Sequence, residues 1–202
     1  MNQTTPEQGH PTNPESLVAP ASFSFFRRPI TNTVPYKGIS LLQAYLDIQS
    51  DRNQWQTDLL RTLSDKNQAK IFKARYFDYV TFSGTFTRRS DASLILHSGL
   101  LTIDLDHVDD LPQVKNALLN DRFFETELLF ISPSGNGLKW IVAIDTGLHS
   151  HLHWFKSIAN YIDISYRLEV DASGKDLSRA CFLPCDPEVY IHPKYLGLTI
   201  ND

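Results

Sequence analysis

The stretch LLTIDLDH, residues 100–107, decides the fold of this chain. Its apolar, β-forming first half leads into two aspartates spaced i and i+2, the pattern of a buried strand that ends in acid. Side chains alternate between the two faces of a strand, so Asp104 and Asp106 point the same way, with Cα atoms about 6.5 to 7 Å apart. Two carboxylates so placed can share a divalent cation. Without a cation they repel and the pKa of the pair rises, unless a nearby base or solvent relieves the repulsion.

The segments around this strand predict an α+β fold. On the expected helix 52–63, Trp55, Leu59 and Leu63 are spaced by four residues, which predicts a core-facing side with Trp55 in the core. Asp109 or Asp110 can cap a helix that has Pro112 in its first turn. The other expected helices cover 39–49, 67–75 and a segment that ends near 161. The other expected strands cover 23–26, 127–131, 138–144, 166–170 and 180–183, and 79–87 is expected to form a strand, a turn or bulge, and a second strand.

Composition bounds the domain organisation and the charge. The 202 residues are 42% hydrophobic, which is enough to bury a core as one domain or as two small lobes. Residues 1–20 are rich in Thr, Pro, Gln, Asn and Glu and predict a disordered tail, followed by a single domain of two sub-lobes over 21–202. The net charge of −4 excludes binding of nucleic acid through overall positive charge, so any such contact must be focused in a local basic groove.

The expected compartment is the cytoplasm. The chain has only two cysteines, and its first twenty residues lack the apolar core of a secretory signal. No apolar run approaches the roughly 18 residues of a membrane span, so we expect no membrane partner.

Two further segments carry polar groups that could complete a site. SPSGNG, residues 132–137, predicts a hairpin loop first and a cradle of backbone amides for an anion second; it is not a Walker loop. Lys139 follows it on the face opposite Trp140, where its ammonium could meet phosphate or solvent. Asp171 ends the expected strand 166–170, with Arg179 nearby, although strand-end aspartates often only cap a loop.

A zinc site is the less favoured interpretation of the histidines and cysteines. Alternating His149, His151 and His153 do not share one face of a helix, and Cys181 and Cys185 form no CxxC motif. A pair of small, buried or semi-buried cysteines is the more direct prediction.

In these residues the chain resembles the VirE N-terminal (BT4734-like) family of mobile elements, which is similar to the archaeo-eukaryotic primase and primase-polymerase superfamily. The resemblance covers residues 23–187 and rests on four segments together: VTFSGTF, LLTIDLDH, SPSGNGLK and VDASGKDLSRACFLP. It implies a primase-polymerase-like fold with an N-terminal α/β unit and an RRM-like antiparallel sheet that carries the acidic site.

The resemblance also implies roles for individual residues. Asp104, Asp106 and Asp171 would be the catalytic carboxylates and the ligands of Mg²⁺ or Mn²⁺. The triphosphate and the template would be held by a second group of residues, namely Ser134, Gly135, Lys139 and Arg179. The superfamily usually has histidine where Lys139 stands, and lysine changes the geometry and pH response of a phosphate contact.

The function implied by the resemblance is two-metal nucleotidyl transfer on a nucleic-acid template during mobile-element replication. The expected partners are nucleotides, single-stranded or template DNA and a helicase-like ATPase. One alternative is a catalytically inactive nucleic-acid-binding or replication-initiation module. A minor alternative is a DxD phosphohydrolase, because IDLDHV superficially matches the DxDx[TV] motif. Two-metal chemistry requires the three aspartates to converge within about 5 Å of one point.

Overall fold

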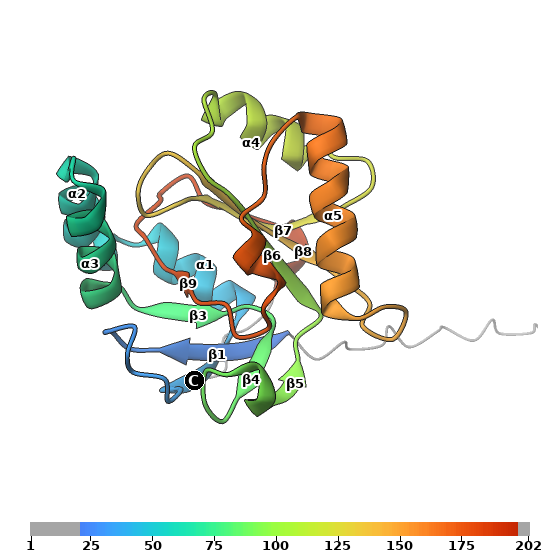
Figure 1. The fold of residues 1–202 in the computed structure, drawn as a ribbon, viewed down its shortest axis with the longest axis horizontal. Coiled ribbons are helices and arrows are strands. Elements are labelled where there is room, and N and C mark those ends of the chain that lie inside the picture. Colours follow the sequence, from blue (N-terminus) through green and yellow to red (C-terminus); the bar gives the residue numbers. More distant parts are fainter. Residues whose placement is uncertain (1–20, 198–202) are drawn as a thin grey trace, which may run out of the picture.

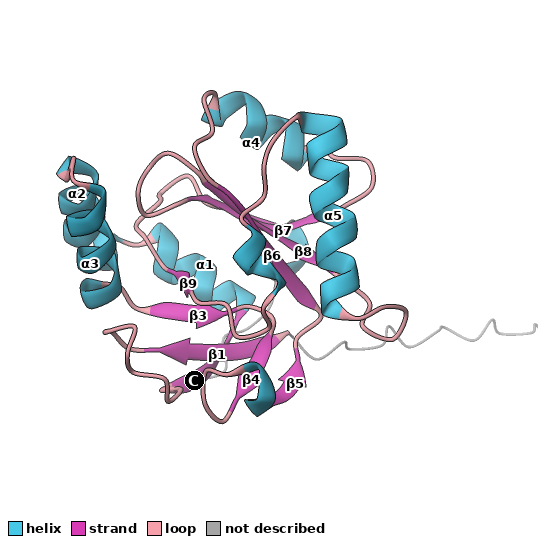
Figure 2. Cartoon of the chain, in the orientation of Figure 1, coloured by secondary structure: helices cyan, strands magenta, loops and turns pink. Residues whose placement is uncertain are grey.

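The computed structural model describes residues 21–197, so the predicted tail 1–20 lies outside the described residues. The described chain is a mixed α+β structure in which every strand pairing is antiparallel (Figures 1 and 2). Over the same range, no helix combines the length and the apolar composition that crossing a membrane requires.

The first sheet has the strand order β2–β1–β3–β9 and draws on distant parts of the sequence. Its strands are β1 (Ser22–Phe26), β2 (Lys37–Ser40), β3 (Tyr79–Thr81) and β9 (Cys181–Phe182). As predicted for 79–87, a turn divides two strands: the chain leaves this sheet after β3 and forms a separate hairpin. That hairpin consists of β4 (Gly84–Phe86) and β5 (Leu94–His97).

The second sheet has the order β10–β7–β8–β6 and contains the LLTIDLDH strand at one edge. Its strands are β6 (Leu100–Leu105), β7 (Thr126–Ile131), β8 (Leu138–Ala143) and β10 (Tyr190–Ile191). Both β6 and β7 run antiparallel to β8, which lies between them, so β6 and β7 point the same way. The helix α4 (Leu111–Leu119) connects them, and α5 (His151–Tyr166) follows β8. Asp110 caps α4 by accepting the Gln113 N–H, as the sequence predicted.

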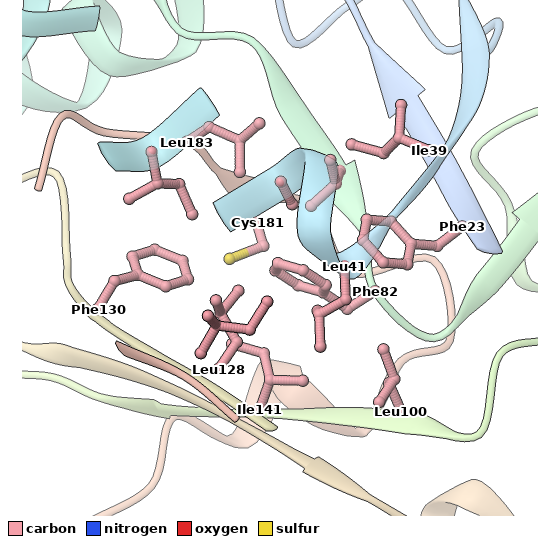
Figure 3. Close-up of a cluster of buried hydrophobic side chains, with 14 of the residues drawn as sticks. Phe23, Ile39, Leu41, Phe82, Leu100, Leu128, Phe130, Ile141, Cys181 and Leu183 are labelled. Atoms are coloured by element: carbon pink, nitrogen blue, oxygen red, sulfur yellow. The ribbon is translucent and has the colours of Figure 1, made fainter. Parts of the chain in front are cut away.

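Two apolar clusters occupy the two faces of this sheet. On one face, Leu101, Ile103 and Leu105 of β6 are fully buried against α4 and α5. On the other face, side chains of the second sheet meet the first sheet and helix α1 (Leu41–Gln49). Figure 3 shows this second cluster, in which Phe130 and Ile141 approach residues from β1, β2 and β9. The two sheets therefore share one core.

Helices α2 (Gln54–Thr62) and α3 (Lys66–Tyr76) stand on the flank away from α5 (Figure 1). Helix α3 contributes no buried residue. The predicted start of α1 was two residues early, because residue 39 belongs to β2 and Ser40 caps the helix by accepting the Gln43 N–H at 3.2 Å.

The prediction that Trp55 lies in the core is wrong. Its side chain is 61% exposed and packs instead on Phe72 and Tyr76 of α3, with ring centroids 6.2 and 6.3 Å away. Helix α2 turns Thr57 and Leu60 toward the interior. A spacing of four residues defines one face of a helix, but it does not say whether that face meets the core or a neighbouring helix.

The prediction of a strand over 166–170 is also wrong. Helix α5 continues to Tyr166 and ends at Arg167, which adopts a left-handed conformation with φ of 55°. Of the segment that follows, Val170 alone pairs with the sheet, as an isolated bridge to Leu105 of β6. Asp171 therefore lies in a loop beside β6 and not at the end of a strand.

Candidate metal centre

Three aspartates from two parts of the chain converge at the end of β6. Asp104 is the penultimate residue of β6, Asp106 follows the strand, and Asp171 comes from the loop after α5. One carboxylate oxygen from each lies within 4.8 Å of the others. The Asp171 N–H donates to the Asp104 carbonyl at 2.9 Å, next to the Leu105–Val170 bridge, and this backbone contact brings the third carboxylate to the first two. The structure thus gathers the residues that the sequence singled out.

Asp104 is buried, and its two carboxylate oxygens differ in their surroundings. Lys139 lies directly opposite in β8, and its ammonium forms an ion pair with Oδ2 of Asp104. Arg179 lies 3.7 Å from the same oxygen. The other oxygen, Oδ1, is buried without a hydrogen-bond partner. Burial raises the pKa of Asp104, and the Lys139 charge offsets part of that effect. A buried, unpartnered carboxylate oxygen is costly, and a bound cation would relieve that cost.

Asp171 has the opposite electrostatic balance. Burial by itself would raise its pKa, but hydrogen bonds from Ser173 and the charge of Arg179 hold the pKa below its usual value. The Ser173 amide and hydroxyl donate to the carboxylate at 2.9 and 2.6 Å, and Arg179 Nη2 lies 2.6 Å from Oδ2. Asp171 is therefore held ionised and in a fixed orientation.

The SPSGNG segment is the predicted hairpin loop between β7 and β8, and it borders the aspartates. Ser132 donates its N–H to the Gly137 carbonyl, and Gly135, with φ of +80°, donates its N–H to the Ser132 carbonyl. The Gly135 amide is therefore used within the turn and is not free to hold an anion. A Cβ at Gly137 would lie 2.4 Å from the Leu105 carbonyl, so the loop packs directly on the end of β6.

The aspartates and this loop line a cleft of about 1030 Å³ that helices α2 and α3 close from the other side. Seven lysines and arginines line it against four aspartates, although the whole chain carries a net charge of −4. This is the focused basic groove that nucleic-acid contact would require. The basic lining residues are Arg61, Lys66, Lys70, Lys73, Arg89, Lys139 and Arg179. Ser134 also lines the cleft, whereas Gly135 contacts the Arg61 side chain.

Sequence reasoning missed the lysines of α3. Lys66, Lys70 and Lys73 are separated by four and three residues, so they share one side of the helix. That spacing was visible in the sequence, but the distant position of α3 along the chain gave no reason to connect it with β6. Burial lowers the pKa of Lys73, as does the charge of Lys139, whereas Asp106 and Asp104 oppose this shift.

The histidines do not join the aspartates or one another in a three-ligand site within residues 21–197. His151 lies with its Nδ1 3.1 Å from Nε2 of His97, and His149 stacks on His153. His151 is therefore paired with His97 and not with His149 or His153.

The two cysteines are buried and unpaired, as predicted. Figure 3 shows the Cys181 sulfur among apolar side chains of the shared core. Burial raises the pKa of this thiol to about 12. A thiol in such surroundings is inert, because the thiolate is the species that binds metal or reacts.

Fold and site together define a mixed α+β protein with three convergent carboxylates beside a basic cleft. The sequence model of the family described as BT4734-like, N-terminal domain, matches residues 72–191. The chain belongs to this family, which the sequence resemblance had named. The matched range includes the three aspartates, the SPSGNG loop and Arg179, and it begins within α3. Comparison with curated proteins and with solved structures found no match.

Proposed function

We propose that this chain is a primase-polymerase-like domain of mobile-element replication that catalyses metal-dependent nucleotidyl transfer on a nucleic-acid template. The observation that carries the proposal is the convergence of Asp104, Asp106 and Asp171 within 4.8 Å at the floor of a basic cleft. Carboxylates so placed suit cations, and the surrounding lysines and arginines suit phosphates.

The topology supports the RRM-like part of this proposal. The order β6–α4–β7–β8–α5 places β8 between two strands of the same direction, which is the split β-α-β arrangement of RRM-like sheets. Val170 then pairs with the outer edge of β6 through one bridge. In this interpretation the last strand of the motif is reduced to Val170, and Asp171 follows it directly.

The residues present fit Mg²⁺ or Mn²⁺, which prefer oxygen ligands. Asp104, Asp106 and Asp171 would hold the ions, and the unpartnered Oδ1 of Asp104 would gain a ligand contact. When bound, such ions lower the pKa of an attacking hydroxyl and stabilise the charge on a leaving pyrophosphate.

The basic residues of the cleft would bind the phosphates of the nucleotide. Lys139 and Arg179 neutralise the aspartates in the free protein, and both can turn to phosphate oxygens when a nucleotide enters. The guanidinium of Arg179 can engage two phosphate oxygens at once, whereas Lys139 acts as a point charge. Ser134 borders the same space from the hairpin loop. The proposed ligands are nucleotides and single-stranded or template DNA, with a helicase-like ATPase as the proposed partner.

One observation favours a second candidate, a catalytically inactive nucleic-acid-binding module. The Lys139 ammonium pairs with Oδ2 of Asp104 and so competes with a metal ion for this carboxylate. In such a module, Asp104→Ala leaves binding of a DNA strand intact, and wild type incorporates no nucleotide with either metal.

Templated primer extension with Mg²⁺ or Mn²⁺ tests the proposal. We expect wild type to extend the primer and Asp104→Ala, Asp106→Ala and Asp171→Ala each to reduce the rate by about 10³-fold or more, because each removes a ligand that positions the ions. Asp163→Ala is the matched control, since Asp163 is exposed on α5 away from the cleft. Wild-type inactivity on DNA and RNA templates, together with no Mn²⁺ binding by calorimetry, would exclude nucleotidyl transfer.

A further inference from the structure

Helix α3 presents a row of lysines to the cleft. Lys66, Lys70 and Lys73 line it, together with Ala69 and Ala74 of the same helix. Lys66 and Lys70 are exposed, and Lys73 is half-buried. The helix buries none of its own residues, so its position does not depend on inserting this face into a core.

The three lysines have no ion-pair partner within residues 21–197. In this they differ from Lys139 and Arg179, whose charges are matched by Asp104 and Asp171. Like charges four residues apart on a helix repel and destabilise it. Three unmatched cations on one side of one helix therefore form a surface that is complementary to an anion with several charges.

The length of the row distinguishes between possible anions. Seven residues separate Lys66 from Lys73, which corresponds to about 10.5 Å along the helix axis. A stacked nucleic-acid strand carries one phosphate about every 3.4 Å, so the row spans about three nucleotide steps. The phosphates of a nucleoside triphosphate share bridging oxygens and are more closely spaced.

The row has a direction relative to the aspartates. Lys73 marks the end of the row nearest the acidic centre, because its Nζ lies 6.0 Å from the ring centroid of Phe182, three residues after Arg179, which contacts Asp104 and Asp171. Lys66, in the first turn of α3, marks the other end. A strand that follows the row therefore leads from solvent to the three aspartates.

We propose that α3 is a phosphate track, in which Lys66, Lys70 and Lys73 hold successive phosphates of a single nucleic-acid strand whose end lies at Asp104, Asp106 and Asp171. The inference rests on the proposed function only for the placement of that end. Binding along the track requires neither a metal ion nor catalysis, because its contacts are between lysine and phosphate.

Fluorescence anisotropy with a labelled single-stranded oligothymidylate of about 12 nucleotides, in the presence of a chelator, tests the track. At about 0.1 M salt, we expect Lys70→Gln to weaken binding about fivefold and Lys66→Gln/Lys70→Gln about 25-fold, with the salt slope reduced by about 0.7 for each lysine. Arg75→Gln is the matched control. It removes the same charge from the same helix, but Arg75 is exposed and does not line the cleft.

The outcomes separate this inference from the proposed function. Equal affinities for Lys70→Gln and Arg75→Gln would overturn the track, even if wild type extends primers. A loss of triphosphate affinity without a loss of strand affinity would also overturn it and assign the lysines to the nucleotide. If Lys70→Gln loses strand affinity while Asp104→Ala keeps it and wild type extends no primer, the track stands and nucleotidyl transfer fails. Circular dichroism melting curves confirm that each variant is folded.

Discussion

The two faces of strand β6 differ in polarity: one is wholly apolar, and the other carries a charged group. One face carries Leu101, Ile103 and Leu105, which are fully buried under α4 and α5. The other face carries Leu100 in the shared core and, four residues later, Asp104 in the basic cleft. Neighbouring residues 103 and 104 thus serve packing on one side and charge on the other.

This difference shows how the fold tolerates a buried carboxylate. The face of β6 that packs on α4 and α5 buries apolar side chains, and this burial stabilises the strand. The opposite face can therefore carry the Asp104 carboxylate, whose burial is unfavourable by itself. Lys139, across the strand pair, supplies the charge that keeps Asp104 in place. The apolar face of β6 therefore supplies the stability of the strand, and Asp104 with Lys139 supplies the charge at its end.

The largest expected effect is on the helical face. Ile103→Ala should lower the free energy of unfolding by about 2–5 kcal/mol, because it leaves a cavity between β6 and the helices. Thr102→Ala, one residue away and facing the other side, should cost less than about 1 kcal/mol. Urea unfolding of both variants measures the difference. An equal loss of unfolding free energy in both variants would show that the two faces of β6 contribute equally to stability, contrary to this expectation.

A smaller effect is expected where Lys139 meets Asp104. Lys139→Met keeps the length of the side chain but removes the ammonium from Oδ2, so affinity for Mn²⁺ should rise about tenfold. Calorimetric titration measures it, with the exposed Lys156→Met of α5 as the control. A fall in Mn²⁺ affinity for Lys139→Met would show that lysine helps to build the metal site and does not compete with the ion.

The smallest effect concerns the other end of β6, beside His97. Burial and the neighbouring His151 lower the pKa of His97 to about 4, and His97 Nδ1 accepts the Gly99 N–H. The unfolded chain therefore binds more protons than the folded chain below about pH 6.5, and stability falls as the pH drops from about 6.5 to 4. Burial also lowers the pKa of His151, against the charge of Asp91, so His151 contributes to the same loss of stability.

Urea unfolding at several pH values checks this expectation. His97→Gln keeps an acceptor for Gly99 but does not titrate, so its stability should vary less with pH over this window than that of wild type. The same pH dependence in both proteins would assign the effect to other groups.

Local patterns predicted much of the fold. Alternation placed Trp140 and Lys139 on opposite faces of β8, and Asp110, one of the two predicted caps, begins α4. The residues after α5 were not predictable, because a left-handed Arg167 ends the helix where an apolar sequence favours a strand.

The candidate site was predictable only where its residues carry their own pattern. The i and i+2 spacing identified Asp104 and Asp106, and the resemblance supplied Asp171. The track lysines of α3 are far from β6 in the sequence, so their approach depends on tertiary packing that no local pattern encodes. The exposure of Trp55 has the same origin, since its partners belong to another helix.

The single bridge between Val170 and Leu105 has one more consequence. Strand β6 is at the edge of its sheet, and an uncovered edge offers backbone groups to which another chain can add a strand and begin to aggregate. The Val170 bridge and the Asp171 N–H, which reaches the Asp104 carbonyl, cover the end of that edge. The segment that delivers the third carboxylate thus also shields a hydrophobic strand from unwanted self-association.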